Sequence, residues 1–106
     1  MAKYLVTGSY TSEGLKGLLK EGGSGRRKAV EDAVKQMGGR LEAYYFAFGD
    51  SDVVTIVDLP DHVTAAALAI GISSTGTVGT RTTVLLTAEE VDEATRKTLS
   101  FRAAGR

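Results

Sequence analysis

A glycine-rich run followed by basic residues has the residue types best suited to binding an anion. Gly22-Gly23-Ser24-Gly25 leads directly into two arginines and a lysine. Glycine-rich backbone at a helix start can surround an anion with N–H groups, and arginine pairs with carboxylate or phosphate oxygens. The run lacks a preceding strand and a following Gly-Lys-Ser/Thr, so it is not a P-loop. We predict an anion site at Ser24, Arg26 and Arg27; the alternative is that these cations pair with acidic residues four positions on.

His62 is the only histidine, and it follows Asp58 and Asp61 near an expected helix start. Imidazole can act as a general base or bind iron, and carboxylates can bind hard cations. The chain has no cysteine and no second histidine to complete a metal site, while a helix start gives the aspartates a capping role. We therefore expect no metal and no cofactor, with His62 as a partly exposed first-turn residue; the alternative is a base or a haem ligand.

Aromatic side chains with one acidic and one basic neighbour form a third candidate site. An apolar cavity with a few converging polar groups is the usual form of a small-molecule site. The alternative is tight packing without a cavity. The residues predicted to line such a cavity, between two paired sheets, are Tyr10, Glu42, Tyr44, Phe46, Phe48 and Arg81.

Length and composition limit the classes of function. The 106 residues predict a single domain over residues 1–100 with a tail at 101–106. Thirteen basic residues balance 13 acidic ones, so no net charge favours nucleic acid or an anionic membrane as a partner. No apolar run reaches the roughly 20 residues that span a bilayer, and the N-terminus does not resemble a signal peptide. We expect a cytoplasmic protein.

Hydrophobic periodicity predicts the order β-α-β-β-α-β-α. The first helix should break at the glycine run, because three interior glycines would cost about 1 kcal/mol each relative to alanine. This order is typical of an α+β, ferredoxin-like fold with a four-stranded antiparallel sheet and two helices on one face. The predicted strands are 4–10, 41–48, 53–58 and 76–86, and the predicted helices are the broken one between 11 and 38, then 61–73 and 88–99.

The second strand predicts self-association. Strict alternation places Leu41, Ala43, Tyr45 and Ala47 on one face of the strand. It places Glu42, Tyr44, Phe46 and Phe48 on the other. Two helices cover only one face of the sheet, which would leave Tyr44, Phe46 and Phe48 exposed as an aromatic patch. A second copy packed face to face would cover it, so we expect a homodimer or higher homo-oligomer with a barrel-like interior.

A known pattern matches four segments of the chain, which are Tyr4–Thr11, Leu18–Arg27, Tyr44–Gly49 and Asp52–Asp61. Together these segments resemble the GYD-domain family, and the similarity extends to about Glu93. The resemblance implies a small stand-alone domain of the dimeric α/β-barrel superfamily, in which comparable clefts serve cofactor-free oxygenases, isomerases and ligand-sensing modules. Ser51 stands where the family's Gly-x-Tyr-Asp signature has an aromatic residue.

Two functional hypotheses follow, and the sequence does not decide whether the protein is an enzyme. The preferred one is a non-catalytic homo-oligomeric domain that binds a small molecule or an anion. The alternative is a cofactor-free or haem-assisted oxygenase or isomerase, with His62 or a tyrosine acting in the cleft between sheets. An enzyme needs a water-accessible cavity with a titratable group pointing into it.

Overall fold

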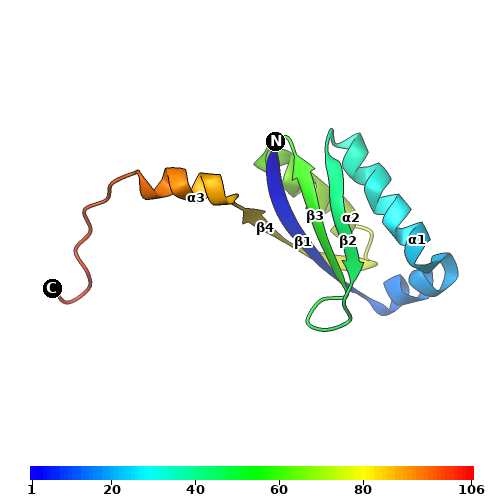
Figure 1. Cartoon of the computed structure of the whole chain (residues 1–106). Coiled ribbons are helices and arrows are strands. Elements are labelled where there is room, and N and C mark those ends of the chain that lie inside the picture. The colour runs from blue at the N-terminus through cyan, green and yellow to red at the C-terminus, as the bar shows by residue number, and fades with distance from the viewer.

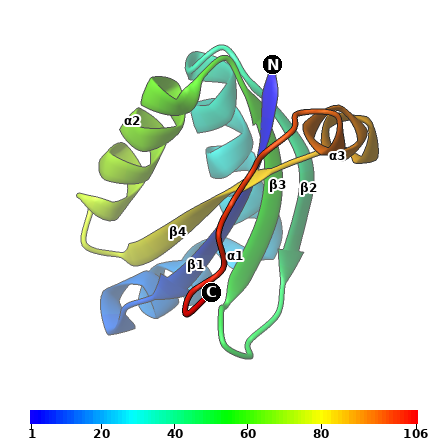
Figure 2. The ribbon, with the colours of Figure 1, turned by 90° about the vertical axis from the view of Figure 1, so that its left-hand side faces the viewer.

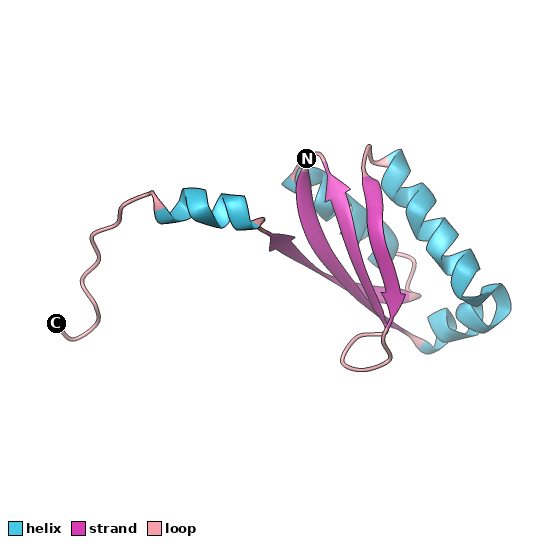
Figure 3. Ribbon diagram, in the orientation of Figure 1, coloured by secondary structure: helices cyan, strands magenta, loops and turns pink.

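The computed structural model describes all residues, 1–106, and has the predicted order of elements (Figures 1 and 3). The four strands form one antiparallel sheet in the order β2-β3-β1-β4. The ferredoxin-like α+β prediction is therefore confirmed. The elements are β1 (Ala2–Tyr10), α1 (Ser12–Gln36), β2 (Arg40–Phe46), β3 (Val53–Leu59), α2 (His62–Ser73), β4 (Val78–Leu85) and α3 (Ala88–Thr95).

Helices α1 and α2 lie on one side of the sheet, and no helix covers the other side (Figures 1 and 2). We call these two sides the helix face and the helix-free face. The core lies between the helices and the helix face, where apolar side chains from both layers are removed from water. Its buried members are Tyr4, Val34, Val57, Leu59, Ala65 and Leu68.

The break in α1 is at Gly22, which has φ 77° and ψ 168° between two helical segments. Only glycine adopts this backbone conformation without a large penalty. Thr11 caps the first segment by accepting a hydrogen bond from the Gly14 N–H. The second segment ends at Gln36, and Gly38 lies just beyond its cap with φ 77°. The glycine run therefore turns the chain within α1, as predicted.

The other two helices begin at predicted caps. The Asp61 side chain accepts a hydrogen bond of 2.8 Å from the Thr64 N–H at the start of α2. Thr87 and Glu90 form a capping box at the start of α3, where the sequence predicted a helix from residue 88. Helix α3 ends at Thr95, four residues before the predicted end.

A β-bulge in β2 overturns the predicted division of that strand into two faces. The pairing with β3 shifts by one residue between Leu41 and Ala43, so that Tyr44 pairs with Thr55 and Phe46 with Val53. The extra residue reverses which face the following side chains occupy. Tyr44 and Phe46 consequently lie on the helix face, whereas Glu42 lies on the helix-free face and accepts a hydrogen bond from Lys3.

The chain after β4 extends away from the domain. Figures 1 and 2 show α3 and the C-terminal residues leaving the sheet on its helix-free side. The radius of gyration is 17.0 Å, whereas a compact chain of about 100 residues has about 13 Å. We call residues 86–106 the C-terminal arm. None of the residues of α3 is buried, and the arm's large apolar side chains, Leu86, Val91, Leu99 and Phe101, are exposed.

Candidate functional site

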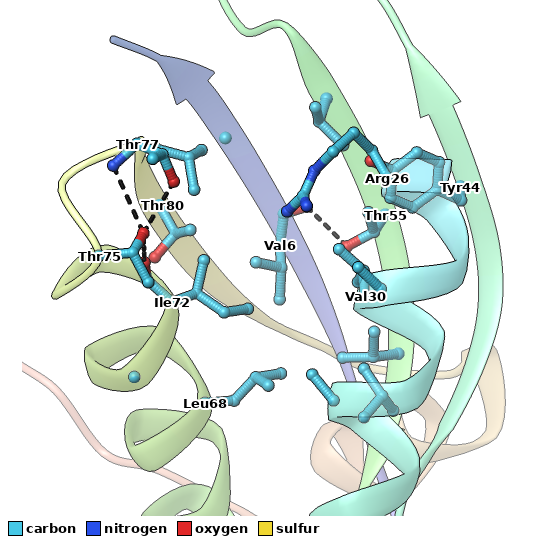
Figure 4. Close-up of a pocket in the computed structure, with 18 of the residues that line it drawn as sticks. Val6, Arg26, Val30, Tyr44, Thr55, Leu68, Ile72, Thr75, Thr77 and Thr80 are labelled. Atoms are coloured by element: carbon cyan, nitrogen blue, oxygen red, sulfur yellow. Dashed lines mark hydrogen bonds between the residues drawn. The ribbon is translucent and has the colours of Figure 1, made fainter. Parts of the chain in front are cut away.

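A cavity of about 470 Å³ lies between α1, α2 and the helix face of the sheet (Figure 4). Its floor includes Val6 of β1 and Thr55 of β3. Its walls include Val30 of α1 and Leu68 and Ile72 of α2. Most of the lining is apolar. This cavity, which we call the helix-face pocket, is on the opposite side of the sheet from the cleft expected between paired sheets.

Small residues on facing helices create the space. Ala29 and Ala33 lie four positions apart on α1, and Ala67 and Gly71 do so on α2, so each pair occupies one side of its helix. Short side chains at these positions leave the helices apart above the sheet. These small residues are visible in the sequence, but their spacing alone does not distinguish close packing of the helices from an opening between them.

Tyr10, Arg26 and Tyr44 form a polar corner at one end of the pocket, and Figure 4 shows Arg26 beside Tyr44. Arg26 Nη1 lies 3.0 Å from Glu21 Oε2, across the kink at Gly22. Burial lowers the pKa of Arg26, but the hydrogen bond to Glu21 and the Tyr10 hydroxyl outweigh it and leave the pKa above its ordinary value. Arg26 therefore stays charged.

At Tyr44, burial disfavours the charged phenolate and strongly raises the pKa, and the neighbouring hydroxyl of Tyr10 adds to the shift. Because the phenol stays protonated at neutral pH, it is available as a hydrogen-bond donor. Threonines lie across the pocket from this corner (Figure 4). Thr75 and Thr77 share a hydrogen bond of 2.7 Å, and Thr80 Oγ1 lies 3.1 Å from the Ser73 hydroxyl.

The aromatic residues of β2 continue from the pocket toward the β2–β3 loop. Tyr44 packs edge to face on Phe46, with ring centroids 5.3 Å apart, and Phe46 stacks on Phe48 at 5.8 Å. A Cβ atom at Gly23 would lie 3.0 Å from the Phe46 ring, so this glycine lets α1 approach the ring closely. Phe46 and Phe48 thus support α1 and the loop and do not line the pocket.

The structure separates the six residues predicted to share one cavity. Tyr10 and Tyr44 line the helix-face pocket, together with Arg26 from the predicted anion site. Arg81 lies on the other side of the sheet with Ser51, in a second hollow of about 280 Å³. Glu42 also lies on that side. The β2 bulge accounts for the separation of Glu42 from Tyr44, which strict alternation would have placed together.

Of the predicted anion-site residues, Arg26 alone lines the pocket, whereas Ser24 and Arg27 are exposed. The alternative role of the charges holds in part. Lys28 Nζ lies 2.7 Å from Asp32 Oδ1, four positions on. Glu31 pairs with Lys35, at 3.9 Å, and forms no ion pair with Arg27.

His62 lies outside the pocket at the first position of α2. Its Nδ1 is 2.6 Å from the hydroxyl of Tyr4, a residue that is only 1% exposed, and the two rings meet edge to face. The partner is 58 positions away in the sequence, so helix-start reasoning did not find it. The structure brings together no group of three or more histidine, aspartate or glutamate side chains that could hold a metal ion.

Comparison with known families gave one match. The sequence matches the GYD domain family over residues 4–95, which includes β1 from Tyr4 onward and every later strand and helix to the end of α3. Comparison with curated proteins and with solved structures gave no significant match. None of the helices is both long and apolar enough to cross a membrane. The match covers most of the chain and both sides of the helix-face pocket, and the protein therefore belongs to the GYD domain family.

Proposed function

We propose that this GYD domain is a cytoplasmic binding module that holds a small, largely apolar molecule in the helix-face pocket. The observation that carries the proposal is an apolar cavity of about 470 Å³ with one polar corner. Small-molecule sites are concave, mostly apolar and roughly 300–1,000 Å³ in volume, with few polar groups that orient the ligand. Replacing water in this pocket with an apolar ligand would be favourable.

The titratable groups of the pocket support binding over acid–base catalysis. They are Tyr10, Arg26 and Tyr44. The raised pKa values of Arg26 and Tyr44 keep both groups protonated at neutral pH. A general base must accept a proton near the working pH, whereas these two groups act as hydrogen-bond donors. The enzyme alternative named His62 or a tyrosine. His62 lies outside the pocket, whereas Tyr10 and Tyr44 line it.

A cavity-filling substitution tests the pocket proposal. Ala66 and Ala67 are both exposed, but only Ala67 lines the pocket. Octan-1-ol, a neutral apolar probe, should shift the methyl resonances of Val30, Leu68 and Ile72 saturably in the wild type. A67F should abolish these shifts and A66F should retain them. Shifts that are equal in both variants, or shifts confined to the helix-free face, would contradict the proposal.

We also propose that two copies pair through their helix-free faces. Leu5 and Ile56 are cross-strand partners on the central strands, and their side chains point to this face. Val54 and Tyr45 are also partners there, and Tyr45 is 70% exposed. The result is an apolar surface without a covering layer, typical of an interaction site.

The course of the C-terminal arm supports a second copy as the occupant. It leaves the sheet on the helix-free side, so it would run along the flank of a domain stacked on that face (Figures 1 and 2). Its exposed apolar side chains, such as Leu99 and Phe101, find no partner in their own chain. A symmetric pair would cover both sheets and both arms at once.

Light scattering coupled to size-exclusion chromatography tests the pairing. The wild type should elute as a dimer at micromolar concentration. Y45E and I56E should be monomeric, because each buries a charge in the interface. V63E, at an exposed position of α2, should remain dimeric. Testing both Y45E and I56E keeps the experiment decisive if one of them misfolds. Circular dichroism should show that each variant is folded. A monomeric wild type would overturn the proposal.

A further inference from the structure

Arg26 is the only fully charged side chain that lines the helix-face pocket. It follows the kink at Gly22, and its side chain is 27% exposed. The remaining surface of the pocket consists of apolar groups, hydroxyls and the Gln36 amide. A molecule that complements this surface has an apolar body and one negatively charged end.

Glu21 forms an ion pair with Arg26 from outside the pocket. The ion pair uses Nη1, at 3.0 Å, and Glu21 is not among the lining residues. Guanidinium has five N–H donors, so most of them are left for other partners. Nearly half of the Glu21 side chain is exposed, and exposed ion pairs contribute little to stability. A ligand carboxylate could therefore replace this one at small cost.

The neighbouring phenols can also donate hydrogen bonds to a negatively charged ligand group. Tyr10 and Tyr44 line the same corner of the pocket as Arg26. Carboxylates accept several hydrogen bonds, and those from charged donors are the strongest. One guanidinium and two phenols at a single end would fix the orientation of an otherwise apolar ligand.

We infer that the helix-face pocket binds an apolar carboxylate, which pairs with Arg26 in place of Glu21 while its hydrocarbon body lies along Val30, Leu68 and Ile72. The inference rests on the proposed binding function and adds the chemical class of the ligand. Glu21 acts as an internal competitor, held near Arg26 by the turn at Gly22.

Titration calorimetry or NMR titration with octanoate and octan-1-ol tests the inference, since the two probes differ only in the charged end. Wild type should bind octanoate at least tenfold more tightly than octan-1-ol. R26Q should remove this preference, because it should weaken the binding of octanoate far more than the binding of octan-1-ol. R27Q, at the adjacent exposed arginine, should keep the preference. E21Q should bind octanoate several-fold more tightly than wild type.

The outcomes separate the two proposals. Equal affinity for both probes in wild type would overturn the carboxylate inference and leave the pocket proposal standing. If R26Q and R27Q lost the preference for octanoate equally, the inference would also be overturned, because the attraction would then be an unspecific effect of positive charge. Failure of both probes to bind would overturn the inference together with the pocket proposal.

Discussion

At the scale of single residues, the hydroxyl of Tyr4 depends on one partner. Tyr4 is almost completely buried, and the imidazole of His62 supplies the hydrogen bond for its hydroxyl at 2.6 Å. A buried polar group that loses its partner costs free energy, because water no longer solvates it fully. His62 therefore has a structural role that its exposed, first-turn position did not indicate.

We expect H62A and Y4F each to lower the free energy of unfolding by about 1 kcal/mol. Because both remove the same hydrogen bond, the double variant should lose less than the sum of the single losses. Urea denaturation of the four proteins measures this coupling. Additive losses would show that the two side chains act independently.

Asp58 should make stability sensitive to acid. Hydrogen bonds from Lys3, at 2.9 Å, and then from Arg40, at 3.0 Å, hold the pKa of its carboxyl below the ordinary value of 3.8. The unfolded chain thus takes up the proton at a higher pH than the folded one. This contribution is present above pH 3.8 and is lost as the pH falls through the folded pKa.

The stability of D58N should accordingly fall less steeply than that of the wild type as the pH is lowered below about 4. Asp92, in α3, has no ion pair, so D92N should follow the wild-type curve. Urea midpoints measured across the acid range provide the comparison. Identical slopes for D58N and wild type would exclude this role of Asp58.

At the scale of elements, the sequence predicted the features that depend on residues close together in the chain, namely the helix break and the helix caps. The break in α1, the Asp61 cap and the Thr87 capping box all depend on residues within four positions of one another. The bulge at Glu42 depends on the pairing of β2 with β3. The pocket depends on how far apart α1 and α2 lie over the sheet, which no local pattern specifies.

The kink in α1 gives a prediction at this scale. A Cβ atom at Gly22 would meet nothing within 4 Å, so only the backbone conformation opposes a side chain there. G22A should destabilise the protein by about 1–3 kcal/mol. Gly17, also without neighbours but helical, is the control: G17A should stabilise by about 0.5–1 kcal/mol.

Opposite shifts of the urea midpoint would therefore identify the conformation of Gly22 as the cause. A neutral G22A would mean that α1 runs straight in solution. In that case the ion pair between Glu21 and Arg26 would need another explanation, because the turn at Gly22 between them is what holds the two side chains together.

At the scale of the whole molecule, the domain and its arm have different solvent environments. The sheet and two helices enclose the core, whereas α3 buries none of its residues. The family match nevertheless continues to residue 95 and so includes α3. The pairing proposed above would give this amphipathic helix an apolar partner surface.

Removing residues 86–106 should leave the fold intact and weaken self-association. The last strand ends at Leu85, so the truncated chain keeps the complete sheet. We expect the dissociation constant of the dimer to rise at least tenfold, measured by analytical ultracentrifugation. Circular dichroism and the octan-1-ol titration are the controls, because the core and the pocket contain no arm residue. An unchanged dissociation constant would assign the arm no part in pairing.

Residue alternation along the strands has a consequence for mutational scanning. Even-numbered side chains of β1 and odd-numbered ones of β3 point to the pocket side, and their immediate neighbours point to the other side. A library selected separately for ligand retention and for self-association should thus divide adjacent codons of one strand into two phenotypic classes. In β2 the parity of each class should reverse at codon 42, so that functional data alone would reveal the bulge.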